Sequence, residues 1–462
     1  MATTAAVPAS SSVGTLDVPT LVSQLMTVER QPIDNLNTKV ASYQTKISSF
    51  GTLKGLASGF QTAVQGLNTS LQGFSATPSD TSVFSATAAS TAAAGTYSLN
   101  ITTLAKAHTL VTAGQASDTS AIAIGASTAT FVVGATSTDV TIAAGASLQD
   151  IRTAINAANM GVTATIVNDG SGTPYRLALT SNATGLSNAI NSITIQAGGD
   201  ADINNLLSRN NIINPPALPS MTQTVAAQDA VFTVNGISIN SASNTVTNAI
   251  QGVTLTLNKN TAATLTVTRD TSAVSTAVSG FVDAYNALAS QLKSRSAYGN
   301  ATAQAGALAG DGTLRLMLDQ MRGIMNTPAT PASGGTLTSL SQVGIAFQAD
   351  GTLKLDSSKL NSAMTNNFSD VTNLFSSTAP TAGFATRLNT WATSAVSAGG
   401  LIDTRTSSLN TSIKSYNDQI SKLEVRMAAI QKQYTATYSN LNMMLSNMNS
   451  TSTYLTQQIA KM

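Results

Sequence analysis

The sequence predicts an α+β protein in which both ends of the chain form a discontinuous helical coiled-coil stalk and β-rich domains are inserted between them. Apolar residues near both ends recur at alternating steps of four and three, the heptad pattern of helices that pair along a narrow seam. The middle is rich in Ser, Thr, Asn, Gly and Ala with β-branched apolar residues, which favours strands and turns. Charged residues make up only 10% of the 462 residues and the formal net charge is +2, so nucleic acid is not an expected partner.

The N-terminal end predicts a short helix preceded by disordered chain. Residues 1–15 are small and polar, and Asp17 is the expected helix cap. Leu21, Leu25 and Val28 follow on one helical face. Ordering residues 1–30 alone costs about 45 kcal/mol, which these anchors and Leu16 offset only against a partner outside the subunit. The sequence therefore predicts a leg over residues 1–35 that is disordered in the monomer.

Two long helices are the predicted stalk. Pro32 is expected to restart the helix, which continues to about Phe74 and is ended by Pro78. The C-terminal helix is expected over about 403–446, followed by a polar tail over 447–462. The seam of the first helix is Leu36, Val40, Tyr43, Ile47 and Phe50, and the seam of the second is Ile413, Tyr416, Ile420, Leu423, Met427 and Ile430.

Apolar residues beyond the seam are the expected partner-binding surface. We expect the seam itself to pair within the chain and to make no partner contact. The remaining apolar residues at the two ends are therefore the ones free to bind another subunit. They are Leu16, Leu21, Leu25, Val28, Leu441, Met444, Leu445, Tyr454, Leu455 and Ile459.

The middle of the chain predicts two β-domains built from similar units. Strands are expected at 97–101, 131–133, 140–142, 162–167 and 176–180, with a short helix at 148–155 capped by Ser147. A related unit is expected at 231–257, where Asn235-Gly236 predicts a hairpin and Val246 and Ile250 predict a helical turn.

Helical periodicity returns after Arg269. One stripe contains Val278, Val282, Tyr285, Leu288 and Leu292, and a second amphipathic segment spans 314–325. Asp350-Gly351 predicts another hairpin, and two short helices are expected around 360–364 and 371–375.

No catalytic, cofactor or metal site is predicted. His108 is the sole imidazole and the chain has no cysteine, so a zinc site or a Ser-His triad is not expected. Asp169-Gly170 and Asp200-Ala-Asp202 lack the twelve-residue calcium-loop pattern and are interpreted as turns. We therefore expect no enzyme activity. No membrane span is expected either, because the most uncharged stretch, residues 119–138, is rich in Ser and Thr and is interrupted by glycine. A cleaved signal peptide is not expected, because residues 1–29 contain no Lys or Arg.

Five motifs occur in order along the chain. They are Leu16-Asp17-Val18 with 21–32, a repeat over 137–185, Asp229–Gly236 with Gly252–Leu257, Gly344-Ile345 with Asp350–Asp356, and Met448–Gln458. Together they resemble the bacterial flagellar filament-capping proteins, the hook-associated proteins at the filament tip (the FliD family), and the repeat is similar to one in flagellin and hook-associated proteins. Thr15 departs from the family, which usually has Gly there, and residues 186–228 are not assigned by the resemblance.

This resemblance implies a structural cap at the distal end of the flagellar filament, in which an oligomeric plate with flexible helical legs promotes the folding and insertion of exported flagellin and prevents its loss. Implied partners are other copies of the chain, with five the family-based number, flagellin, hook-associated junction proteins and an export chaperone. The implied location is extracellular, after export through the flagellar secretion apparatus. The implied domains are the legs 1–35 and 435–462, the stalk 36–75 and 273–434, a β-domain 76–110 and 222–272, and an outer β-domain 111–221.

Two other functions fit parts of the sequence. A hook–filament junction protein shares the helical ends and the repeat, but it lacks the ending Met448–Gln458 and stays at the filament base. A secreted surface adhesin explains the β-rich middle, but it does not explain paired heptads at both ends. The sequence leaves open whether the β-domains also take part in cell adhesion.

Overall fold

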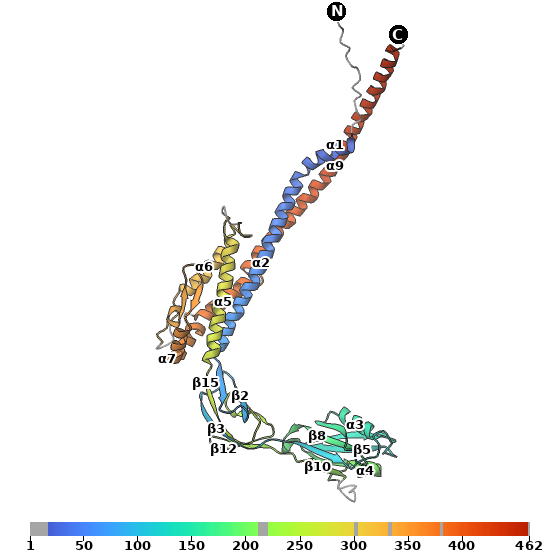
Figure 1. The fold of residues 1–462 in the computed structure, drawn as a ribbon, viewed down its shortest axis with the longest axis vertical. Coiled ribbons are helices and arrows are strands. Elements are labelled where there is room, and N and C mark those ends of the chain that lie inside the picture. Colours follow the sequence, from blue (N-terminus) through green and yellow to red (C-terminus); the bar gives the residue numbers. More distant parts are fainter. Residues whose placement is uncertain (1–16, 211–219, 300–303, 331–334, 379–381, 461–462) are drawn as a thin grey trace, which may run out of the picture. The chain divides into compact units, whose positions relative to one another are not determined.

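The computed structural model describes residues 17–210, 220–299, 304–330, 335–378 and 382–460. Long helices at both ends of the chain and β-sheets between them confirm the predicted α+β class (Figure 1). The chain divides into two compact units. One contains Met1–Leu71 and Val274–Met462, and the other contains Gln72–Ala273.

The first unit is helical and surrounds one large apolar core. A 3₁₀ turn at Leu340–Val343 and a two-stranded hairpin, β16 (Ile345–Phe347) with β17 (Leu353–Leu355), complete it. Its helices are α1 (Val18–Glu29), α2 (Gln31–Ser70), α5 (Thr271–Ser296), α6 (Gly312–Asn326), α7 (Ser357–Ser376), α8 (Phe384–Val396) and α9 (Leu401–Ile459).

Helix α2 has 40 residues and is about 60 Å long at 1.5 Å per residue. The restart predicted at Pro32 is present, because α1 ends at Glu29 and α2 begins at Gln31. The predicted end near Phe74 is wrong. Phe74 begins strand β1 instead, and Pro78 is tolerated there because β1 is an edge strand that pairs only with β15.

The second half of α2 is a core helix and not a coiled-coil seam. One face of it is fully buried, and the helix packs against α8 in the same core as α5; the buried residues are Phe50, Leu53, Ala57, Phe60, Val64 and Leu67. The stripe predicted on α5 is buried in this core as well. Helix α7 contains the two predicted short helices, separated by a non-helical backbone at Asn367.

Helix α9 is longer than the sequence predicted. It has 59 residues and runs to Ile459, so the expected end near Ser446 and the separate polar tail are wrong. No Gly or Pro occurs in this helix to stop it. Ser and Thr hydroxyls in its last turns donate to carbonyls four residues earlier, as Ser450 does to Ser446 and Thr456 to Ser452.

The second unit contains two β-rich layers with separate cores. The first has a five-stranded sheet in the order β1-β15-β3-β11-β12 and a three-stranded sheet in the order β13-β14-β2. Its strands are β1 (Phe74–Pro78), β2 (Phe84–Ala88), β3 (Gly95–Thr103), β11 (Ala230–Val234), β12 (Ile237–Ser241), β13 (Thr245–Ile250), β14 (Val253–Leu257) and β15 (Ala262–Arg269).

The hairpin predicted at Asn235-Gly236 joins β11 to β12, with both turn residues at positive φ, as this turn requires. The helical turn predicted around Val246 and Ile250 is wrong. Both residues lie in strand β13, whose register against β14 shifts between them. Residues four apart lie on the same side of a regular strand, so the spacing of these two buried residues fits a strand as well as a helix.

The outer sheets have the strand orders β10-β4-β8-β7 and β6-β5-β9. The predicted strands and the helix capped by Ser147 are present here. The elements are β4 (Ala107–Thr112), β5 (Ser127–Val133), β6 (Thr136–Ile142), α3 (Leu148–Ala157), β7 (Val162–Asn168), β8 (Tyr175–Thr184), a 3₁₀ turn (Leu186–Asn188), β9 (Ile190–Ile195), α4 (Ala201–Leu207) and β10 (Met221–Val225). Strands β4 and β10 cross the boundaries expected at residues 110 and 221, and both belong to the same outer sheet.

Candidate functional site

Helix α1 begins at a sequence-encoded cap and packs against α9. The Asp17 carboxylate accepts hydrogen bonds from the Thr20 amide at 3.2 Å and from its hydroxyl at 2.6 Å. Val18, Val22 and Met26 then lie on one face and form a buried cluster with Ile33 of α2 and Met427 of α9. Helices α1 and α2 therefore both lie against α9 (Figure 1).

This packing corrects the predicted disordered leg. The spacing of Leu21, Leu25 and Val28 predicts them as the anchors, but the neighbouring face of the same helix also carries apolar residues at helical spacing. In the structure Val28 is 63% exposed, and Leu21 and Leu25 are half-buried outside the cluster. The segment Val18–Glu29 thus has a partner within its own chain, whereas Leu16 lies outside the described residues.

Polar contacts also join α9 to the residues between α1 and α2. The Tyr434 hydroxyl donates to the Glu29 carboxylate at 3.0 Å, and the Arg30 guanidinium lies 3.3 Å from the Glu424 carboxylate. This hydrogen bond raises the pKa of Tyr434, because it stabilises the protonated hydroxyl, and the negative charge of Glu29 acts in the same direction. These are the chain's only two glutamates, so both of them help to attach α1 to α9.

Helices α2 and α9 pack against each other, and most of the expected seam residues are half-buried along them: Leu36, Val40, Tyr43, Ile47, Ile413, Tyr416, Ile420, Leu423 and Ile430. Phe50 and Met427 are buried, but Phe50 lies in the core of the helical unit and Met427 lies in the cluster with α1. The rings of Tyr43 and Tyr416 have centroids 5.6 Å apart, and the Lys39 ammonium lies 5.7 Å from the Tyr416 centroid. The helices run antiparallel here, because Arg30 meets Glu424 while Tyr43 meets Tyr416.

Beyond α1, the end of α9 carries an apolar strip that belongs to none of the apolar clusters in the described part of the chain and is called uncovered below. The strip consists of Leu441, Leu445, Met448, Leu455 and Ile459, which continue the steps of four and three with Ser452 between them. Leu455 is 55% exposed and Ile459 is 72% exposed, while Leu445 is half-buried. The expected residues Met444 and Tyr454 are exposed beside the strip, and the sequence analysis missed Met448, which its heptad position would have identified.

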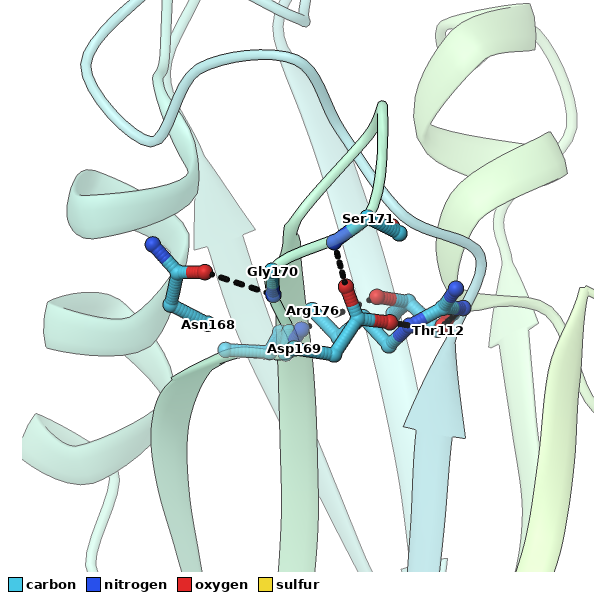
Figure 2. Close-up of polar contacts among 7 residues, drawn as sticks. Thr112, Asn168, Asp169, Gly170, Ser171 and Arg176 are labelled. Atoms are coloured by element: carbon cyan, nitrogen blue, oxygen red, sulfur yellow. Dashed lines mark hydrogen bonds and ion pairs between the residues drawn. The ribbon is translucent and has the colours of Figure 1, made fainter.

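Both candidate turns in the outer sheets have structural roles. Figure 2 shows the turn between β7 and β8, in which the Asp169 carboxylate accepts from the Ser171 amide at 3.0 Å and from Arg176 Nε at 2.6 Å. These hydrogen bonds hold the pKa of Asp169 well below its usual range. Arg176 also donates to the Thr112 carbonyl, so the pair fastens the hairpin to β4.

His108 lies buried in β4, as a strand residue, and its two ring nitrogens contact Ile190 and Gln223. Across the described part of the chain, no three His, Asp or Glu side chains gather as a metal site. The described helices also include none that is long and apolar enough to cross a membrane.

The fold and this surface define a class of protein. Its terminal helices pair with each other, its β-rich domains are inserted between them in the sequence, and one helix end carries an uncovered apolar strip. Comparison with known proteins identifies the family. The N-terminal model of flagellar hook-associated protein 2 matches residues 14–108, its C-terminal model matches residues 227–450, and the flagellin hook IN motif matches residues 130–183.

Relatives match over nearly the whole chain. The chain is 36% identical to flagellar hook-associated protein 2 of Escherichia coli (strain K12), covering 96% of each sequence, and 29% identical to the B-type protein of Pseudomonas aeruginosa, covering 98% of each. The crystal structure of the flagellar cap protein FliD D1-D2-D3 domains from Escherichia coli superposes with a TM-score of 0.68 at 35% identity, covering 78% of this chain and 99% of that one. This chain belongs to the flagellar hook-associated protein 2 family.

Proposed function

We propose that this chain is a structural cap at the distal end of the bacterial flagellar filament. Its membership of the flagellar hook-associated protein 2 family and its likeness to a solved flagellar cap protein support the assignment. In this proposal several copies, five by analogy with the family, form a plate whose helical legs reach the filament end. Its location is outside the cell, after export through the flagellar secretion apparatus.

The observation that carries the proposal is the uncovered strip of α9. A heptad strip stabilises a helix pair only when a second helix covers it. The segment 441–459 is about 28 Å long at 1.5 Å per residue, which is enough for several turns of contact with a partner helix. We propose that this partner helix belongs to flagellin at the growing end of the filament.

A cap of this kind acts through binding and makes no covalent bond. The paired helices hold the leg, and the plate confines newly exported flagellin so that it folds and inserts instead of diffusing away. The leg must therefore bind and release repeatedly, which suits a contact limited to one helix end. Hook-associated junction proteins and an export chaperone are further proposed partners during export and assembly.

Loss of the leg tests the proposal. Deletion of residues 447–462 removes most of the strip but none of the two described apolar cores of the β-rich unit. We expect the circular dichroism of the strands to persist while filament growth stops. Normal motility with the deletion would contradict the assignment.

Charge substitutions give a sharper version of this test. Leu455→Glu with Ile459→Glu places two charges in the strip, and Ser450→Glu with Gln457→Glu places two charges elsewhere on the same exposed stretch. We expect the first pair to abolish filament growth and the second pair to leave it nearly unchanged, because only the strip is covered on docking. Equal effects of the two pairs would show that charge alone, and not the strip, is responsible.

Immunogold labelling distinguishes the remaining functions. A cap labels the filament tip, a junction protein labels the base, and an adhesin labels other surfaces. Electron microscopy of the assembled cap then counts the copies in the ring.

A further inference from the structure

We propose that Met443, Met444 and Met448 of α9 form an oxidation site, at which peroxides convert the thioethers to sulfoxides and release the leg from the filament. This inference rests on the proposed function of the α9 strip. Methionine sulfoxide is reversible by dedicated reductases, so the site would act as a reversible switch.

The three side chains are far more accessible than most methionines of the chain. Their exposed fractions are 60%, 62% and 62%, whereas Met317 and Met321 in the helical core are fully buried. The chain has no cysteine, so no thiol competes for the oxidant. Among the methionines that the structure describes, the three thioethers of α9 are therefore the ones that a peroxide reaches most easily.

The chemistry needs only a peroxide as co-reactant. The thioether sulfur attacks one oxygen of hydrogen peroxide, so that an S–O bond forms and the O–O bond breaks. The proton on the attacked oxygen passes to the leaving hydroxide, which becomes water. Sulfur loses two electrons and the peroxide gains two. Each step replaces an apolar side chain by one with a strong hydrogen-bond acceptor.

The positions of Met444 and Met448 make this change important for docking. Met448 belongs to the strip, and Met444 lies one helical turn before it. In the free chain their sulfoxides remain in water, so α9 loses little stability. When a partner helix covers the strip, these two sulfoxides are removed from water, and we expect an affinity loss of roughly tenfold for each one.

Peptide mapping by mass spectrometry tests the chemical part. The full-length chain is treated with hydrogen peroxide, which is then removed with catalase before analysis. We expect Met443, Met444 and Met448 to oxidise at least about tenfold faster than Met317 and Met321, because a buried thioether reacts only after local opening. Equal rates at the two groups would overturn the inference.

Co-sedimentation with flagellin filaments of the same bacterium tests the consequence. The treated chain should lose filament binding, and methionine sulfoxide reductases A and B should restore it. A variant with Met443→Leu, Met444→Leu and Met448→Leu lacks the three thioethers, so peroxide treatment should leave its level of filament binding where it was before treatment. Circular dichroism of the treated chain should be unchanged.

The outcomes separate this inference from the proposed function. If the untreated chain binds filaments and the oxidised chain binds equally well, the oxidation switch is wrong and the cap assignment stands. If the leucine variant loses binding after peroxide treatment as the natural chain does, damage elsewhere is responsible and the inference is again wrong. If the untreated chain does not bind filaments, the proposed function fails and the switch fails with it.

Discussion

Asp200 shows how one side chain can organise two segments of the outer sheets. Its Oδ1 accepts from the amides of Asp202 and Ile203 and so caps α4. Its Oδ2 accepts from the amides of Ile124 at 2.8 Å and Gly125 at 2.7 Å, which lie just before β5. These donors, Gly125 foremost, lower the pKa of Asp200, so the carboxylate stays ionised in the fold.

We predict that Asp200→Ala lowers the free energy of unfolding by about 1–3 kcal/mol, because it removes a helix cap and leaves four amides without this acceptor. Urea denaturation followed by circular dichroism measures the change. Asp202→Ala is the matched control, since it removes a neighbouring carboxylate from the first turn of α4, and it should cost only about 0.5 kcal/mol. Similar losses in both variants would contradict the special role of Asp200.

His108 is the only side chain of this protein whose ordinary pKa lies near neutrality. Its Nδ1 accepts from the Ile190 amide at 2.9 Å, and its Nε2 lies 3.1 Å from Gln223 Oε1. Only a neutral ring with its proton on Nε2 satisfies both contacts. Burial lowers the pKa of His108, and the positive charge of nearby Arg209 acts in the same direction.

We predict that the free energy of unfolding decreases as the pH is lowered below about 6.5, because the histidine takes up a proton there in the unfolded chain but not in the folded one. The lowered folded pKa fixes this sign, because the contribution is complete at higher pH and declines as the pH decreases. Urea midpoints at about pH 7.5 and about pH 5 measure it. Because the chain has one histidine, His108→Gln should remove the dependence in this window. An unchanged dependence in the variant would assign it to other groups.

Among the elements, those with one apolar face and one packing partner were predictable from the sequence. Helix α5 and the hairpins at Asn235-Gly236 and Asp350-Gly351 are examples. Helix α1 was not, because Val18, Val22 and Met26 compete with Leu21, Leu25 and Val28 for the role of buried face. Both sets have helical spacing, and only the position of α9 in the fold decides between them.

The end of α9 was missed for a different reason. Residues 447–459 are rich in Ser, Thr and Asn, which have modest helix propensity, so they resembled a tail. Propensity is a weak guide where no Gly or Pro interrupts a long helix and hydroxyls bond back to its carbonyls. The steps of four and three between apolar residues predict the candidate strip. Its exposure does not follow from that spacing, because it depends on how much of α9 is covered by α1.

We predict that the amides of α1 are protected from hydrogen exchange in the isolated chain by its packing on α9. Val22→Asp places a charge in the buried cluster and should reduce the protection of residues 22–29 to that of an unfolded segment, while α2 stays protected. Val28→Asp makes the same change at an exposed position of α1 and should have little effect. Absence of protection in the natural chain would restore the disordered leg expected from the sequence.

In the molecule as a whole, the architecture depends on helices from opposite ends of the sequence pairing within one chain. The seam between α2 and α9 encloses all of the chain between residues 43 and 416, including the complete β-rich unit. Closing so long a loop is entropically unfavourable, and the core that α2 shares with α5 and α8 offsets it. A heptad seam could in principle pair with a second chain instead, so the intramolecular pairing is a testable claim.

We predict that Tyr43→Cys with Tyr416→Cys forms an intramolecular cross-link with a short bismaleimide, because these rings face each other across the seam. The natural chain has no cysteine, so the reaction reports only the introduced pair, and the closed chain is recognised by its shifted migration on a denaturing gel. Tyr43→Cys with Tyr438→Cys is the control, since residue 438 lies about 33 Å farther along α9 at 1.5 Å per residue and should not react. Cross-linked dimers in place of closed monomers would show that the stalk is formed between chains.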